Sequence, residues 1–376
     1  MINRHVKVRR LPGWKGREIA ISDIHGDLKT YEKLLDQVNY RPGEDRLILL
    51  GDLVEKGTEN LPLLRKVMKQ TEEEIVFCIK GNCDFTATNF LLSYRLGYIH
   101  KILLDRQKSL IHEMIREAGL PEMDENTDMD QLAEELRKRY LPELTFLHSL
   151  PHMLITPERI YVHAGLQNEK TGAEDFRDVM TCPLFDQTAP AFRKTVVVGH
   201  MPVTEYCVRK ADFSCRFNGV KNLWSIDGGN VVKRAGQLNA LIFESSVIRT
   251  EYADRLPEVR VLHTVQAENR SPFFVPWNHG EVQIIEKGPL RSSVHSDYLN
   301  RSFWIDNEFL RDNRGSDFTN FQMPVVAGET VSLVCLYGKK AQIKKHGVLG
   351  WTDALNLDLD ALDMETLMNA ANPARF

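Results

Sequence analysis

Six side chains able to bind metal ions follow short apolar runs in this sequence of 376 residues. Carboxylate, imidazole and amide groups are the usual ligands of divalent cations such as manganese, iron and zinc. Two cations can share one carboxylate, so a set of this composition suits a site with two metal ions. The candidate ligands are Asp23, His25, Asp52, Asn82, His163 and His200.

Each of these signals is weak when it stands alone. A short D-x-H-G string is usually a turn, and a buried histidine is usually a hydrogen-bonded core residue. Several of the candidates have a glycine beside them, which lets the backbone turn sharply under an open site. Because all six candidates occupy the ends of successive apolar runs, the metal-site interpretation is favoured over coincidence.

The segments around the candidates alternate between two periodicities. Strand-like runs are followed by stretches with apolar residues at helical spacing, a pattern that predicts a sheet covered by helices. Ligands in such sheets gather at the carboxyl ends of the strands, where Asp23, Asp52 and Asn82 fall. The first predicted strands span residues 18–22, 45–50 and 74–79, and the first predicted helices span residues 27–38 and 58–70.

The remainder of the chain divides into two regions. Residues of about 86–150 have a helical pattern and are predicted to form a cap beside the site, within a first domain of residues 1–250. Residues 251–376 contain short β-like runs and are predicted to form a small β-rich accessory domain with a C-terminal helix. Gly347 to Asp353 resembles the closing strand of bacterial SH3-like barrels, which implies at most a module that binds a peptide or protein partner.

Composition argues against several classes of protein. The formal net charge of −4 disfavours a basic face for nucleic acid. No segment approaches the roughly 20 apolar residues that span a membrane, and we expect a cytoplasmic protein. The six cysteines form no C-x-x-C pair, so we expect reduced thiols.

Five sequence blocks occur in an order that is typical of one family. They read SDIHGD, GDLVEKG, GNCD, VHAGL and VGHMP. With these blocks, Arg17 to Phe243 resembles the calcineurin-like metallophosphoesterases, and most closely the bacterial serine/threonine phosphoprotein-phosphatase branch, which includes diadenosine tetraphosphate hydrolases. The resemblance implies an α/β fold, a metallophosphoesterase β-sandwich flanked by helices, followed here by the small all-β, SH3-like domain.

The resemblance also implies a role for each candidate ligand. Asp23 and His25 would hold one of two divalent ions, and Asp52 would bridge both. The second ion would be held by Asn82, His163 and His200. Manganese is the expected metal, with iron or zinc as alternatives, because mixed oxygen and imidazole ligands do not select one ion.

Three positions depart from the family pattern beside these ligands. Cys83 replaces the histidine that is implied to protonate the leaving group, and Glu55 replaces its aspartate partner. Lys56 replaces a phosphate-binding arginine, which keeps the charge but loses the planar guanidinium. A second family arginine has no clear match, and Arg177 and Arg193 are the candidates for its place.

The resemblance implies a metal-dependent phosphoesterase that hydrolyses phosphomonoesters or phosphoanhydrides by attack of water bound between two metals. Its catalytic residues would include Asp52, Lys56, Glu55 and Cys83. The substrate would be a phosphorylated small molecule, a nucleotide or a phosphoprotein. Without the family acid, leaving groups that depart as anions should react better than serine or threonine alkoxides. Two alternatives stay open: a catalytically weak protein that binds phosphorylated ligands or partners, and a phosphoesterase acting on nucleotides or RNA ends.

Overall fold

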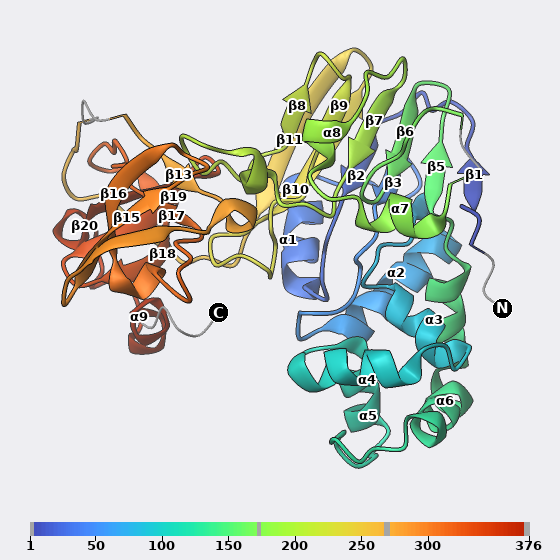
Figure 1. Ribbon diagram of the computed structural model, residues 1–376. Coiled ribbons are helices and arrows are strands. Elements are labelled where there is room, and N and C mark those ends of the chain that lie inside the picture. Colours follow the sequence, from blue (N-terminus) through green and yellow to red (C-terminus); the bar gives the residue numbers. More distant parts are fainter. Residues whose placement is uncertain (1–3, 171–173, 267–270, 372–376) are drawn as a thin grey trace. The chain divides into compact units, whose positions relative to one another are not determined.

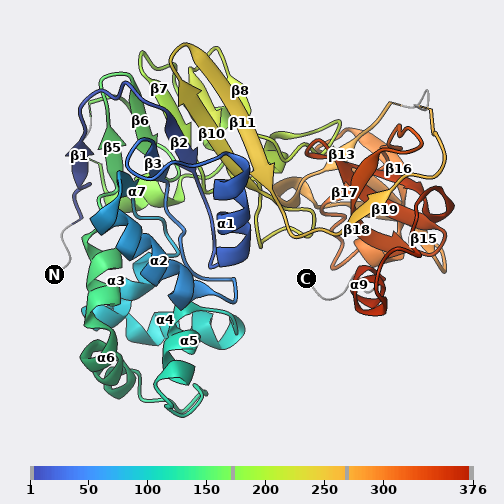
Figure 2. The ribbon, with the colours of Figure 1, turned by 180° about the vertical axis from the view of Figure 1, so that it is seen from behind.

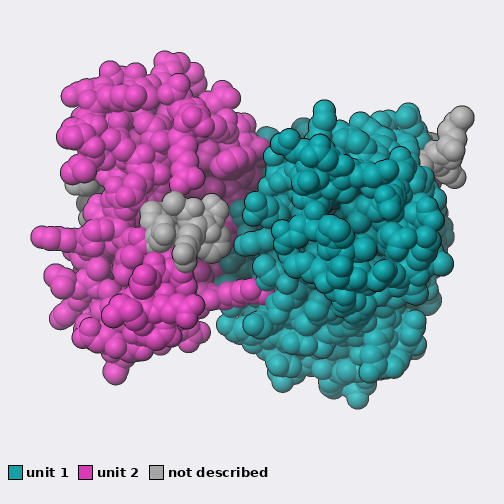
Figure 3. Space-filling model, turned by 90° about the horizontal axis from the view of Figure 1, so that it is seen from below, with its two compact units in different colours: residues 1–202, 215–232, 236–254 teal, residues 203–214, 233–235, 255–376 magenta. Residues whose placement is uncertain are grey.

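A computed structural model of the chain describes residues 4–170, 174–266 and 271–371. The chain divides into two compact units, shown in different colours in Figure 3. The first comprises residues 1–202, 215–232 and 236–254, and the second comprises residues 203–214, 233–235 and 255–376. The second unit therefore includes two short segments that lie inside the sequence-predicted range of the first domain.

The first unit is built on two stacked sheets. Buried side chains from both sheets, among them Ile48, Tyr161 and Val197, form one apolar cluster between them. One sheet has the strand order β11 (Val247–Ala253), β10 (Leu238–Glu244), β2 (Glu18–Ile21), β3 (Arg46–Leu49) and β4 (Val76–Cys78). The other has the order β1 (Val8–Arg10), β5 (Met153–Ile155), β6 (Arg159–Val162), β7 (Thr195–Val198), β9 (Leu223–Ser225) and β8 (Arg216–Asn218).

Helices cover the outer face of each sheet. Figures 1 and 2 show the helices from α1 to α6 gathered beside the five-stranded sheet, and their apolar faces share a core with it. The six-stranded sheet carries α7 (Phe176–Thr181) and α8 (Phe185–Thr188). The larger helices are α1 (Leu28–Gln37), α2 (Asn60–Glu73), α3 (Phe85–Leu91), α4 (Leu96–Asp105), α5 (Leu110–Glu117) and α6 (Met129–Ser149). This layered arrangement confirms the predicted α/β sandwich.

Local sequence explains where the first helix begins. The side chain of Asp27 accepts a hydrogen bond from the Thr30 amide at 2.9 Å and so caps the helix. Tyr31, Leu34 and Leu35 then recur at helical spacing and are buried against the sheet. The helix therefore starts directly after the Asp23 to Gly26 turn.

The second unit contains only antiparallel sheets among the described residues. Its sheets have four strands in the order β12-β18-β19-β20, three in the order β14-β15-β16, and two in the pair β13-β17. Their bounds are β12 (Glu258–Arg260), β13 (Phe274–Val275), β14 (Gln283–Lys287), β15 (Arg291–Ser296), β16 (Arg301–Asp306), β17 (Phe318–Thr319), β18 (Thr330–Tyr337), β19 (Lys340–Lys345) and β20 (Val348–Asp353). The short helix α9 (Met364–Ala370) packs on β18. The predicted β-rich C-terminal region is confirmed.

None of the helices in the described residues is both long enough and apolar enough to cross a membrane.

Candidate metal centre

All six candidate ligands lie just beyond the carboxyl ends of strands in the two stacked sheets. β2, β3 and β4 end immediately before the segments that carry Asp23, Asp52 and Asn82. β6 and β7 of the other sheet end before His163 and His200. The sandwich therefore brings ligands from both sheets to one edge, as the strand-end argument predicts.

Several ligands have an unusual backbone conformation. The φ angles are positive at Asp23 (56°), His25 (54°), Asp52 (50°) and His200 (66°). Residues other than glycine seldom adopt this left-handed region, and each instance costs of order 1 kcal/mol or more. Such residues cluster at functional sites because the surrounding fold compensates for the strain.

The carboxylate of Asp52 lies between two imidazoles. Its Oδ2 atom is 3.8 Å from His25 Nε2, and its Oδ1 atom is 3.4 Å from His163 Nε2. On the first side, Asp23 Oδ1 lies 3.9 Å from the same His25 nitrogen. Each oxygen of Asp52 thus faces a different group of candidate ligands, which is the arrangement of a bridging carboxylate.

The second group forms around the Asn82 side chain. One atom of its amide lies 3.2 Å from His163 Nε2 and 2.9 Å from His200 Nδ1. His163 Nδ1 lies 2.8 Å from the Leu50 carbonyl oxygen. In the neutral ring, donation of a hydrogen bond from Nδ1 to this oxygen leaves a lone pair on Nε2. Backbone partners of this kind fix the orientation of metal-binding imidazoles.

Asp84 organises the loop that presents Asp52. Its carboxylate accepts hydrogen bonds from the backbone amides of Asp52 at 2.9 Å, Leu53 at 2.9 Å and Gly81 at 2.8 Å. One side chain therefore joins the turns after β3 and β4. The sequence contains a signal for this residue, since Asp84 completes the GNCD block, but sequence analysis gave it no role.

Two glycines are required by close contacts in the site. A Cβ atom on Gly81 would lie 2.1 Å from Asp52 Oδ1, and one on Gly199 would lie 2.3 Å from Asp23 Oδ2. Both distances are far below van der Waals contact. Any side chain at either position would displace a candidate ligand.

Burial disfavours ionisation of the carboxyl groups in this site. Burial and the neighbouring Asp52 raise the pKa of Asp23 to about 8. Asp227 is also buried, and its pKa is raised well above the usual value by burial and by Asp23. Burial opposes ionisation of Asp52 as well, but His163, His25 and Lys56 lower its pKa overall. Burial lowers the pKa of His25 to about 3, so this ring is neutral and able to act as a ligand.

These donors fit two divalent cations. Asp23, Asp52 and His163 offer ligand atoms within 4.8 Å of one another, as do His25, Asp52 and Cys83. The ammonium group of Lys56 lies 3.3 Å from His25 Nε2, so a cation already neighbours the first group of ligands. Bound cations stabilise a site in which lone pairs face one another and buried carboxyl groups lie close together.

Glu55 and Cys83 are buried beside the candidate metal ligands. Cys83 is 3% exposed, its backbone amide donates to Asp52 Oδ1 at 2.8 Å, and burial raises the pKa of its thiol well above the usual value. The buried carboxylate of Glu55 pairs with Arg106 at 3.0 Å. Arg106 has no motif signal, and sequence analysis missed it because only the packing of the cap brings it to Glu55.

The two candidate arginines do not join the ligand group. Arg177 is largely exposed and pairs with Asp175 at 2.7 Å. Arg193 is exposed, and its backbone amide bonds to Glu169. Among the described residues, no hydrogen bond or ion pair connects either side chain to a candidate ligand.

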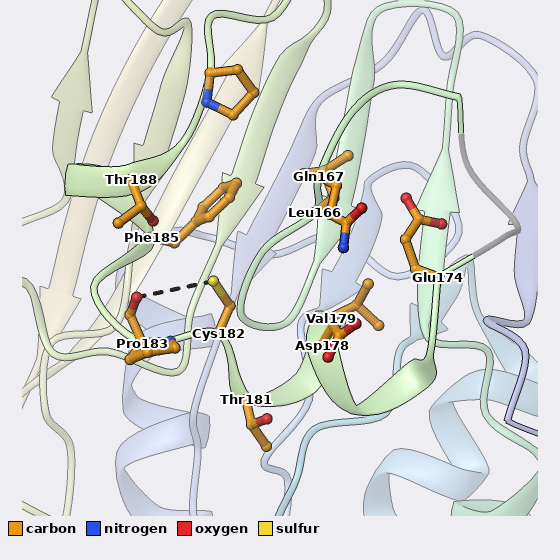
Figure 4. A pocket seen from close by; sticks show the side chains of 11 residues that line it. Leu166, Gln167, Glu174, Asp178, Val179, Thr181, Cys182, Pro183, Phe185 and Thr188 are labelled. Atoms are coloured by element: carbon orange, nitrogen blue, oxygen red, sulfur yellow. Dashed lines mark hydrogen bonds between the residues drawn. The ribbon is translucent and has the colours of Figure 1, made fainter.

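A cavity of about 620 Å³ lies beyond the strand end that carries His163. Figure 4 shows Phe185 and Thr188 on one side of it, Leu166 and Gln167 near its centre, and Asp178 on α7. Its wall adjoins the metal-ligand segment, because the Ala164 amide donates to the Val179 carbonyl at 2.9 Å. A mixed apolar and polar lining of this size suits a small organic group.

In a thermal melt with chelator present, the metal-free protein is expected to lose stability as the pH rises from about 4 to about 8. The pKa of Asp23 is raised to about 8 and that of Glu55 to about 7, mainly by burial. A carboxyl group whose pKa is raised by folding stabilises the protein below its unfolded pKa, and this stability disappears as the pH rises through the folded value.

Two controls test this cause. Saturating manganese should flatten the pH dependence of Tm, because the cation stabilises the ionised form of Asp23. Glu55→Gln removes one of the ionisations and should reduce the slope in chelator. A Tm that stays constant or increases with pH in the metal-free wild type would contradict the prediction.

Comparison with known proteins identifies the family of this chain. A sequence model of the family described as calcineurin-like phosphoesterase matches residues 17–232. A symmetrical bis(5'-nucleosyl)-tetraphosphatase of Pseudomonas putida is 32% identical over 122 residues, which cover 32% of this chain and 36% of that protein. The same-named protein of Wigglesworthia glossinidia brevipalpis is 22% identical over 263 residues, which cover 68% of this chain and 76% of that protein.

A solved structure of a Saccharomyces cerevisiae protein serine/threonine phosphatase matches with a TM-score of 0.42 and 10% identity, over 67% of this chain and 85% of that one. The family match covers residues 17–232 of 376. Since this is more than half of the chain and contains every candidate ligand, the protein belongs to the calcineurin-like phosphoesterase family.

Proposed function

We propose that this protein is a metal-dependent hydrolase that cleaves phosphoanhydride bonds of nucleotides. One observation carries the proposal: the two oxygens of Asp52 face separate groups of ligands, with His25 on one side and His163 on the other. Family membership and the relatives named bis(5'-nucleosyl)-tetraphosphatases support the same class of reaction.

Two bound divalent ions would supply a water of lowered pKa and would neutralise oxygens of the phosphoryl group. We propose that Asp23 and His25 hold one ion, that Asn82, His163 and His200 hold the other, and that Asp52 bridges them. Manganese is our expected metal, with iron or zinc as alternatives. Lys56 would add a positive charge near the first ion, because its ammonium lies 3.3 Å from His25 Nε2.

The substituted positions favour phosphoanhydrides over alkyl esters. The Cys83 thiol is buried and its pKa is raised by that burial and by Asp52, so it is a poor proton donor. A leaving nucleoside phosphate departs as an anion and needs no proton, whereas a serine alkoxide does. A nucleoside could lie in the cavity lined by Leu166 and Phe185, which adjoins the ligand segment.

Turnover of two substrates tests the proposal. Purified protein loaded with manganese should hydrolyse bis(5'-adenosyl) tetraphosphate and p-nitrophenyl phosphate. A chelator should abolish both activities, and added manganese should restore them. Metal binding without hydrolysis of either compound would contradict the proposal and would favour the alternative of a protein that binds phosphorylated ligands.

The second unit is proposed to bind a peptide or protein partner, as the resemblance of Gly347 to Asp353 to SH3-like barrels implies. Loss of partner binding by the second unit should leave hydrolysis of p-nitrophenyl phosphate unchanged, since every proposed metal ligand lies in the first unit.

A further inference from the structure

Arg106 lies beside the substituted catalytic positions, although it belongs to the helical cap. It follows α4 directly, and its backbone amide donates to the Ile102 carbonyl at 2.9 Å. Its side chain reaches the Glu55 carboxylate at 3.0 Å. Glu55 occupies the position that matches the family aspartate, which orients the histidine that Cys83 replaces.

Most of the hydrogen-bonding capacity of Arg106 is unused. A guanidinium has five N–H donors, and within the described part of the chain the Arg106 side chain uses one of them, in the hydrogen bond from Nη1 to Glu55. Its side chain is 29% exposed, whereas Glu55 is fully buried. The buried Glu55 carboxylate therefore holds one side of the guanidinium. Its other N–H donors remain accessible to solvent or to a ligand.

The positive charge of Arg106 interacts with groups of the candidate metal site. Burial opposes its charge, but Cys83, Glu55 and Asp52 raise its pKa above the usual value. Burial raises the pKa of the Cys83 thiol overall, and the positive charges of Lys56 and Arg106 oppose this increase. The site therefore has two cationic side chains, with Lys56 next to His25 and Arg106 next to Glu55.

A network of hydrogen bonds fixes the cap relative to Glu55. The Lys56 amide donates to the Lys108 carbonyl at 3.0 Å, two residues beyond Arg106. The Glu55 amide donates to Asn60 Oδ1 at 2.6 Å, and Asn60 Nδ2 donates to Glu113 of α5 at 2.7 Å. These contacts fix the backbone on both sides of the ion pair, and the Glu55 carboxylate holds the guanidinium itself.

We propose that Arg106, positioned by Glu55, binds the leaving-group phosphate of a phosphoanhydride substrate. This inference rests on the proposed function. A water oxygen forms the new bond to phosphorus, the bridging P–O bond breaks, and its electron pair stays on the departing nucleoside phosphate. One proton of the water remains on the product phosphate and the other goes to solvent. Arg106 neutralises the departing anion without transferring a proton, because a guanidinium does not deprotonate in proteins.

Two substrates separate this role from general effects on the metal centre. p-Nitrophenyl phosphate has no phosphate in its leaving group, whereas bis(5'-adenosyl) tetraphosphate does. Arg106→Ala should lower kcat/KM for the tetraphosphate by about 10²-fold, the usual cost of removing one transition-state donor. It should change kcat/KM for p-nitrophenyl phosphate by less than about threefold. Arg106→Lys keeps the charge and should lose less.

Binding gives a second readout. Titration calorimetry with ADP should show weaker binding to manganese-loaded Arg106→Ala, whereas inorganic phosphate should bind as it does to the wild type. Lys101→Ala is the matched control, because Lys101 is an exposed cation on α4, the helix that Arg106 follows, and it should change neither affinity.

Each outcome has a separate meaning. If Arg106→Ala lowers kcat/KM equally for both substrates, or for neither, the role of Arg106 is overturned. Hydrolysis of both substrates by the wild type would still support the proposed function. A wild type inactive on both substrates would instead contradict the proposed function, and unchanged ADP affinity in Arg106→Ala would overturn the inference independently of turnover. Retained hydrolysis of p-nitrophenyl phosphate in each variant shows that the metal centre has folded.

Discussion

Asp52→Asn is expected to lower hydrolysis of p-nitrophenyl phosphate and of nucleotide substrates by more than about 10³-fold, because loss of an outer-shell partner alone costs about 10 to 100-fold. Asp52 is 2% exposed and lies within 3.8 Å of His25 and 3.4 Å of His163. The amide has one oxygen and no negative charge, so it cannot face both groups as a carboxylate does. Steady-state kinetics with excess manganese measure the effect.

Two measurements exclude trivial causes of this loss. Metal analysis of Asp52→Asn should show fewer than the wild-type number of bound ions, while its circular dichroism should match the wild type. Asp36→Asn makes the same chemical change on the exposed face of α1 and should retain full activity. Substantial turnover by Asp52→Asn would refute a bridging role for this carboxylate.

The second large effect concerns the leaving group. Phosphoanhydrides and aryl phosphates should be cleaved faster than a phosphoserine peptide by about 10² to 10⁴-fold, the usual contribution of a general acid. Cys83 is buried, and its high pKa keeps the thiol protonated but weakly acidic. Phosphate and nitrophenolate leave as anions, whereas a serine alkoxide needs a proton in the transition state.

Comparison of kcat/KM for three substrates under one set of conditions tests this preference. Bis(5'-adenosyl) tetraphosphate, p-nitrophenyl phosphate and a phosphoserine peptide differ in the acidity of the leaving group. The preference should persist at saturating manganese, because the metals do not replace the missing acid. If the phosphoserine peptide is the best of the three, Cys83 has not removed the acid function and the mechanism is different.

Short strands and exposed edges limited what the sequence could predict about the fold. The buried runs of β2 and β3 were predicted, but β11 is mostly exposed and β1 has only three residues. An edge strand is paired on one side, so it needs no continuous apolar run, and its sequence carries little signal. A C-terminal helix was predicted, and the structure has it as α9 at Met364–Ala370.

The sequence by itself determined the family, the order of the ligands and their position at strand ends, because each of these properties is local. A ligand with a glycine beside it at the end of an apolar run is visible without any tertiary contact. The roles assigned to the metal ligands remain predictions, but their convergence around Asp52 is what strand order in a sandwich would produce.

Only the tertiary structure decided which cation accompanies the substituted residues. Arg106 is separated from Glu55 by 51 positions, and no periodicity or motif connects them. Their contact depends on the packing of α4 and α5 and on the hydrogen bonds from Asn60 and Lys56 that hold the cap. Because pairing across the fold is set by packing and not by local sequence, the sequence could not show that Arg106 lies beside Glu55.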